Sequence, residues 1–260
     1  MGANNVLVRR EGGTVIATIN RPDKLNALNK DVFDELKALL DVLDTEKQAK
    51  ALIIAGAGEK AFCVGADLKE RQGMNEKAVL MRFAQVKALY AKMEDFRLPI
   101  IAAVDGLALG GGLELALACD MRVAASTASL GFPEVGLAII PGNGGTQRLS
   151  RLVGMGRALE LILTGRRLSA SEAETLGLVN QVVPPGEAVQ AAKRLAEQMR
   201  ISGPLALAQA KRAIRQGFEV PLKEALDIET EAYRVCLQSQ DRLEGLNAFT
   251  EKRTPEYRGE

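Results

Sequence analysis

The longest apolar stretch of the chain, residues 98–119, limits what the protein can fold into. Its length approaches that of a membrane span, but it contains Asp105 and Glu114. Each carboxylate near the centre of a bilayer would cost about 2.5–3.5 kcal/mol on insertion scales. We therefore expect the stretch to form the centre of a soluble core, with an apolar strand over 99–104, a turn of consecutive glycines and a helix over 113–119.

Short β-branched runs and amphipathic segments alternate through much of the chain, which predicts an α/β fold. Strands are expected over residues 14–20, 51–55, 99–104, 121–125 and 180–183. Helices are expected after a cap region at 29–31, over 76–96, and in turns broken by glycines between 144 and 178, where Ser169 begins a capping sequence. From about Glu187 to Phe249 only helical periodicity remains.

This change of pattern predicts two parts, an α/β core over residues 1–195 and a helical region over residues 196–260. The second part carries broad apolar faces that include Leu222, Leu226 and Tyr233. A few helices of this size are too small to fold alone. They are expected to pack on the core or on another subunit.

The composition excludes several classes of protein. The chain has no histidine, which rules out Ser-His-Asp and Cys-His nucleophile systems and imidazole bases. Its 34 Lys and Arg residues nearly balance 33 Asp and Glu residues, so nucleic-acid and membrane binding are not expected. Cys63, Cys119 and Cys236 lie far apart without a CxxC spacing, which favours reduced thiols in a cytoplasmic protein and no metal site.

Phosphate-binding motifs are weak or absent. Gly56, Gly58 and Ala61 match a loose dinucleotide fingerprint, but residues 61–65 do not have the pattern of the helix that should follow. A turn that ends a strand is the better interpretation. The chain has no Gly-Lys dipeptide and no Gly-x-Ser-x-Gly sequence, so it has neither a Walker A loop nor a nucleophile elbow.

Three segments together suggest a catalytic site. They are the small-residue loop 65–69, the triple glycine 110–112 that enters a helix, and Phe132-Pro133-Glu134 with the Gly/Pro-rich stretch after it. Consecutive glycines indicate a positive φ or a close approach to the backbone. Free N–H groups at a helix N-terminus can bind a developing oxyanion. The pattern therefore suggests proton chemistry next to a carbonyl group.

Glu114 lies among apolar residues and is expected to be buried. A buried glutamate must be paired, hydrogen-bonded or protonated, and such residues are concentrated at functional sites. The alternative is a structural salt bridge to an arginine such as Arg122 or Arg148. The residues alone leave both interpretations open.

In these motifs the sequence resembles the enoyl-CoA hydratase/isomerase (crotonase) family over nearly the whole chain, about residues 20–253. The most specific matches are GADLK at 65–69, ALGGGLELALACD at 108–120, PEVGL at 133–137 and PGNGGTQRL at 141–149. The resemblance implies a crotonase-type spiral of β-β-α turns with a C-terminal α-helical trimerisation region. It further implies a homotrimer or a dimer of trimers, that is, a homohexamer.

The resemblance also implies roles for individual residues. Glu114 and Glu134 match the two catalytic glutamates of hydratases, with Glu114 assigned to water activation and Glu134 to proton delivery at C2. Ala66 and Gly111 match the two oxyanion-hole N–H donors. Residues similar to those that bind CoA are Lys24, Ala66, Asp67, Leu68, Lys69, Gly111, Phe249 and Lys252, the last two often acting across a subunit boundary. Each of these lysines could equally be solvated surface charge.

The implied activity is hydration of short-chain trans-2-enoyl-CoA in fatty-acid or branched-chain amino-acid degradation, without a cofactor beyond the CoA of the substrate. The alternatives are a methylglutaconyl-CoA hydratase, an enoyl-CoA isomerase and a non-catalytic CoA- or RNA-binding homologue. Residues 31–44 carry five acidic residues against one lysine, which argues against the last. Asn143 stands where relatives usually carry a small or apolar residue. It is expected either to add a polar group to the acyl pocket, favouring short or carboxylate-bearing acyl groups, or only to accommodate a left-handed turn.

Overall fold

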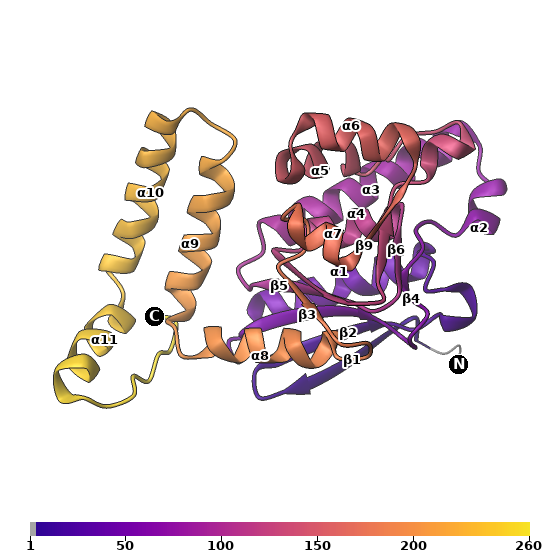
Figure 1. The fold of residues 1–260 in the computed structure, drawn as a ribbon. Helices are drawn as coiled ribbons and strands as arrows, with labels where there is room; N and C mark the ends of the chain where they lie inside the picture. The colour runs from indigo at the N-terminus through magenta and orange to yellow at the C-terminus, as the bar shows by residue number, and fades with distance from the viewer. Residues whose placement is uncertain (1–3) are drawn as a thin grey trace.

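A computed structural model describes residues 4–260, and two sheets organise its core (Figure 1). The larger has the strand order β1-β2-β3-β5-β7-β10, and the smaller has the order β4-β6-β8-β9. All pairings are parallel except β1 with β2 and β8 with β9. The strands are β1 Val6–Glu11, β2 Thr14–Ile19, β3 Ala51–Gly56, β4 Ala61–Cys63, β5 Ile100–Val104, β6 Leu107–Leu109, β7 Met121–Ala125, β8 Ser129–Gly131, β9 Arg167–Ser169 and β10 Gln181–Val183.

The chain winds through both sheets as a spiral. In each turn one strand enters the larger sheet and the next strand enters the smaller one, as β3 and β4, β5 and β6, and β7 and β8 do. Helices then lead into the following turn. The helices are α1 Lys30–Thr45, α2 Leu68–Gln72, α3 Glu76–Glu94, α4 Gly111–Ala118, α5 Gly145–Val153, α6 Met155–Thr164, α7 Ala170–Thr175, α8 Ala188–Arg200, α9 Pro204–Gly217, α10 Leu222–Leu237 and α11 Gln240–Glu251, with 3₁₀ turns η1 Pro22–Lys24 and η2 Glu134–Leu137.

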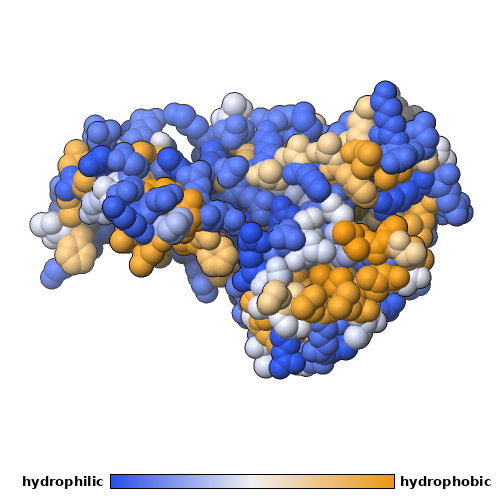
Figure 2. Space-filling model, turned by 90° about the horizontal axis from the view of Figure 1, so that it is seen from above, coloured by the Kyte–Doolittle hydropathy of each residue, from blue (hydrophilic) through white to orange (hydrophobic). Residues whose placement is uncertain are grey.

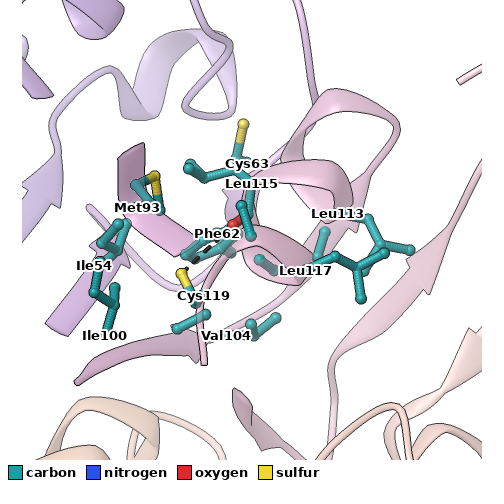
Figure 3. Packing of buried hydrophobic residues seen from close by; sticks show 14 of the residues in the cluster. Ile54, Phe62, Cys63, Met93, Ile100, Val104, Leu113, Leu115, Leu117 and Cys119 are labelled. Carbon is teal, nitrogen blue, oxygen red and sulfur yellow. Dashed lines mark hydrogen bonds between the residues drawn. The ribbon is translucent and has the colours of Figure 1, made fainter. Parts of the chain in front are cut away.

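Helix α4 lies at the centre of the main hydrophobic core. Every residue from Gly112 to Ala118 is buried. Side chains from β3, β4, α3, β5 and α4 meet there (Figure 3), among them Ile54, Phe62, Met93 and Leu115. Parallel strands that are covered on both faces become continuously apolar, which explains the sequence of β5. Within residues 4–260 no helix has both the length and the apolar character needed to cross a bilayer.

The α/β fold and the expected longer elements are confirmed. Asn29 caps α1 and Ser169 forms the capping box of α7. Two expectations were incomplete. Helix α4 begins at Gly111, two residues earlier than expected, and the segment between 144 and 178 contains the short strand β9 as well as helices.

The C-terminal helices α9, α10 and α11 stand beside the core at the left of Figure 1. Helix α8 instead packs its alanines Ala188, Ala191, Ala192 and Ala196 against the larger sheet. The proposed division at residue 195 therefore falls inside α8. The division of the chain into two parts remains a prediction.

Candidate active site

Two backbone N–H groups lie side by side where β4 and β6 end. Leu28 pairs with the loop around Ala66: its N–H donates to Gly65 O at 2.7 Å, and its carbonyl accepts from Asp67 N at 2.9 Å. This pairing turns the Ala66 N–H away from Leu28. Gly111 begins α4, so its N–H has no acceptor within the helix. A methyl group on Gly111 would lie 3.5 Å from Ala66 N, so the two donors are neighbours.

Glu114 is 1% exposed and accepts hydrogen bonds on both carboxylate oxygens. Its Oε1 accepts from Asn143 N at 2.7 Å and Gly145 N at 2.9 Å, and its Oε2 accepts from Asn143 Nδ2 at 3.1 Å. Gly145 is the first residue of α5, so the positive end of that helix faces the carboxylate. All three contacts are donors, and they suit the ionised form of Glu114.

The alternative interpretation of Glu114 as half of a salt bridge is wrong. Arg122 donates to the carbonyl oxygens of Ala116, Cys119 and Leu178. Arg148 pairs with Glu94 through two 2.7 Å contacts. Neither arginine is within salt-bridge distance of Glu114 in residues 4–260.

Glu134 has quite different surroundings. It begins η2, and a methyl group on Gly110 would lie 2.9 Å from its Oε1. Its Oε2 is buried without a hydrogen-bond partner in the described residues. Burial raises the pKa of Glu134 to about 7, and the negative charge of Glu114 adds to the effect, while Arg71 opposes it. Near neutral pH the Glu134 carboxyl group can therefore hold a proton.

Asn143 both contacts Glu114 and lines the cleft that contains Ala66. Its backbone N–H and its amide Nδ2 both donate to Glu114, while its Oδ1 is buried and has no partner within residues 4–260. Its φ is not positive, so the left-handed-turn alternative is wrong. Asn143 lines a cleft whose other walls include Ala66 and the apolar side chains of Leu28, Phe33, Met74, Val79, Phe83 and Val86.

Two arginines also line this cleft. Arg82 pairs with Glu70 at 3.3 Å. The guanidinium carbon of Arg71 lies 4.9 Å from the centre of the Phe83 ring, and Arg71 has no carboxylate partner among the residues that the structure describes. Nothing in the sequence distinguished Arg71 from other surface arginines. Its significance comes from the fold, which brings the end of α2 against α3.

The remaining predicted residues fall into two groups. Lys24, Leu68 and Lys69 are exposed close to Ala66, because loop 25–28 packs against loop 64–67. Asp67 caps α2 and pairs with Arg21 at 2.8 Å, so its carboxylate already has partners.

Phe249 and Lys252 belong to the second group. They lie in α11 and at its C-cap, which Figure 1 places at the opposite side of the molecule from α2. One chain therefore does not bring them to Ala66.

An α/β spiral with two free N–H groups beside two unlike carboxylates is the arrangement of a crotonase-type protein. The chain matches the family model described as enoyl-CoA hydratase/isomerase over residues 9–260. It is 44% identical over 253 residues to the short-chain-enoyl-CoA hydratase of Clostridium acetobutylicum, covering 97% of each chain. It is 46% identical over 252 residues to the mitochondrial methylglutaconyl-CoA hydratase of Mus musculus, covering 95% of this chain and 80% of that one.

A solved structure agrees with these sequence matches. The enoyl-CoA hydratase from Bacillus anthracis is 49% identical and superposes with a TM-score of 0.96, covering 98% of this chain and 100% of that one. The chain belongs to the enoyl-CoA hydratase/isomerase family. The predicted crotonase-type fold is thereby confirmed.

Proposed function

We propose that the protein is an enoyl-CoA hydratase that adds water across the 2,3 double bond of short-chain trans-2-enoyl-CoA to give 3-hydroxyacyl-CoA. The observation that carries the proposal is the contrast between the two carboxylates. Glu114 is held by three N–H donors, whereas burial raises the pKa of Glu134 to about 7. The addition of water to a double bond needs one base and one acid, and this pair can supply both.

In the proposed reaction the N–H groups of Ala66 and Gly111 bind the thioester oxygen and make C3 electrophilic. Glu114 takes a proton from the water molecule while the water oxygen forms a bond to C3. The π electrons of the 2,3 double bond then move towards C2 and the thioester oxygen. Glu134 gives its proton to C2. The loss of one oxyanion donor typically costs about 10²–10³ in rate. The substrate carries its own CoA, and the proposal includes no further cofactor.

Replacing each carboxylate tests this proposal. Glu114→Gln and Glu134→Gln should each lower crotonyl-CoA hydration by about 10²–10⁴ or more, because each removes a proton-transfer group. Binding of butyryl-CoA should change little, since the CoA portion supplies most of the affinity. Exposed Glu224 gives a matched Glu→Gln control. Near wild-type hydration by either variant would refute the two-carboxylate mechanism, and isomerisation of 3-enoyl-CoA without hydration would favour the isomerase alternative.

A second candidate is hydration of 3-methylglutaconyl-CoA, whose acyl group ends in a carboxylate. The relative from Mus musculus has that name. The observation in its favour is Arg71, a cation without a carboxylate partner among residues 4–260, in the same cleft as Ala66 and Asn143. Buried or half-buried cations normally have a counter-charge.

Matched substrates separate the two candidates. Glutaconyl-CoA and 2-hexenoyl-CoA have acyl chains of similar length, but only the first ends in a carboxylate. If the carboxylate binds Arg71, Arg71→Gln should lower kcat/KM for glutaconyl-CoA by about tenfold or more and leave 2-hexenoyl-CoA within about twofold. Lys77→Gln, an exposed change on α3, is the control. Equal losses for both substrates would exclude this role and leave the simple enoyl-CoA hydratase.

The C-terminal helices support the proposal of a homotrimer or a dimer of trimers. Ile214, Phe218 and Leu222 are 73%, 66% and 75% exposed in one chain. Figure 2 shows apolar surface both on these helices, at its left, and over the core. Apolar patches of this kind are typical of subunit interfaces. In such an assembly Phe249 and Lys252 would reach the CoA site of a neighbouring subunit, as the resemblance implies.

The proposed compartment is the cytoplasm. Burial raises the pKa of Cys63 and of Cys119 to about 12, so both thiols are protonated and unreactive at neutral pH. Fatty-acid or branched-chain amino-acid degradation is the proposed setting, because both produce short 2-enoyl-CoA thioesters.

A further inference from the structure

The loop that holds Glu114 is itself held by an arginine. Arg148 Nη1 donates to the carbonyl oxygen of Asn143 at 2.8 Å. A methyl group on Gly144 would lie 2.0 Å from the same Nη1, so the guanidinium fills the space beside the loop. Asn143 and Gly145 are the two residues whose N–H groups bind Glu114. The position of Arg148 therefore fixes the donors of the proposed base.

Arg148 also contacts the other side of the site. Its guanidinium carbon lies 5.8 Å from the centre of the Tyr90 ring. The buried Tyr90 hydroxyl donates to the carbonyl oxygen of Gly111 at 3.3 Å. One guanidinium thus contacts residues that support both the base and the oxyanion donors.

Glu94, at the end of α3, connects Arg148 to the C-terminal helices. Its two oxygens accept from Arg148 Nε and Nη2, both at 2.7 Å. Its Oε1 also accepts from Arg215 Nη1 of α9 at 3.2 Å. Arg215 is further bound to Asp120, with Nη2 at 2.8 Å from Oδ1. A continuous set of ion pairs and hydrogen bonds therefore runs from α9 to Glu114.

We infer that Arg215 and Glu94 are positioning residues for Glu114, acting through Arg148 and Asn143, so that one contact from α9, that of Arg215 with Glu94, sets the geometry of the proposed base. This inference rests on the proposed function of Glu114 and concerns the control of the same site.

The simpler alternative is that Arg215 only attaches α9 to the core. Lys211 separates the two interpretations, because it lies one turn earlier on the same helix and attaches α9 just as firmly. It is 9% exposed, pairs with Asp120 at 2.8 Å, and donates to the carbonyl oxygens of Met93 and Leu98 at 3.1 Å. Unlike Arg215, it makes no contact with the Glu94 carboxylate in the described residues.

The test compares Arg215→Gln, Glu94→Gln, the double variant and the control Lys211→Gln in the full-length protein. Hydrogen exchange of the Asn143 and Gly145 amides reports the loop directly, because both donate to Glu114. We expect about tenfold faster exchange in Arg215→Gln and in Glu94→Gln. For crotonyl-CoA we expect a kcat about 5–20-fold lower and a KM within about twofold, since misplacement of a catalytic group affects the reaction more than CoA binding.

Two comparisons decide between the interpretations. The amide exchange rates and kcat of the double variant should match those of Glu94→Gln within about twofold, because both changes interrupt the same set of contacts. Lys211→Gln should lower the thermal midpoint at least as much as Arg215→Gln but leave loop exchange and kcat within about twofold of wild type. Arg215→Lys, which keeps the charge, should show an intermediate effect and serves if a glutamine variant does not fold.

Equal effects of Lys211→Gln and Arg215→Gln on amide exchange and kcat would overturn the inference. A loss of kcat in the double variant equal to the product of the losses in the two single variants would overturn it as well. Absence of crotonyl-CoA hydration by the wild-type protein would overturn the proposed function instead. The exchange measurement would still test the positioning of Glu114 in that case, so the two failures are distinguishable.

Discussion

The raised pKa of Glu134 should make the free energy of unfolding depend on pH, in the same pH range in which it affects catalysis. In the unfolded chain this carboxyl group has its ordinary pKa of 4.5, and in the folded protein burial raises the pKa to about 7. Below pH 4.5 the group is protonated in both states and has no effect on the free energy of unfolding. Above pH 7 it is ionised in both states, and the folded state is destabilised by the buried charge.

The size of this effect follows from the two pKa values. At about 1.36 kcal/mol per pKa unit, the difference between 4.5 and about 7 corresponds to about 3 kcal/mol. Partial solvent exposure of the side chain reduces the expected value to about 1–3 kcal/mol. Glu134→Gln removes the charge at every pH. It should therefore stabilise the protein by about that amount at pH 8 and by almost nothing at pH 4.5.

Urea unfolding of wild type and Glu134→Gln at several pH values between 4.5 and 8.5 measures this difference. Exposed Glu76 provides the control, because Glu76→Gln should show no such increase with pH. In the same range, kcat/KM of the wild type for crotonyl-CoA should fall above about pH 7, where Glu134 loses the proton that it delivers. A stability difference that is constant with pH, or largest at low pH, would refute the assignment of Glu134 as the neutral partner.

Two further predictions concern packing and assembly. Gly112→Ala should destabilise the protein by about 2–3 kcal/mol or prevent folding, because its methyl group would lie 2.1 Å from Cys63 O. Gly136→Ala, with nothing within 4 Å, should be tolerated in the same urea unfolding assay, and equal losses in both variants would contradict the packing argument. Sedimentation should give a mass several times 27.9 kDa. Ile214→Glu with Phe218→Glu should lower that mass, and a stable active monomer in the wild type would refute the proposed interface.

Elements with strong local signals could be predicted from the sequence. Helix α1 has both a regular apolar face and the cap Asn29, and β5 is a continuous apolar run. The six-residue strand β1 was not predicted. The strands β4, β6, β8 and β9 were not predicted either, because each has only three residues and, unlike the equally short β10, no proline directly after it to mark its end. A strand of that length shows no alternation, and its pairing is decided by how successive turns of the spiral stack.

The candidate site was predictable in its residue types but not in its contacts. The apolar neighbours of Glu114 indicated burial, yet the sequence left an arginine partner possible. In the fold, loop 141–145 supplies the N–H donors instead, although Asn143 is 29 residues away from Glu114 in the sequence. Arg148, the alternative partner, is taken by Glu94, which lies 54 residues away from it. Contacts of this range depend on the register of the whole spiral, which no local pattern contains.

The triple glycine shows how the fold produces the contrast between the two glutamates. Gly110 has a φ of 53° and lies against Glu134, where a side chain would collide with the carboxylate. Gly112 lets α4 approach Cys63 O closely, and this places Glu114, two residues later, under the N-terminus of α5. Glu114 thus meets a helix end that stabilises negative charge, whereas Glu134 is partly buried beside a bare glycine, and its Oε2 has no hydrogen-bond partner in the described residues. The same short turn that exposes the Gly111 N–H therefore also gives the two carboxylates their different surroundings.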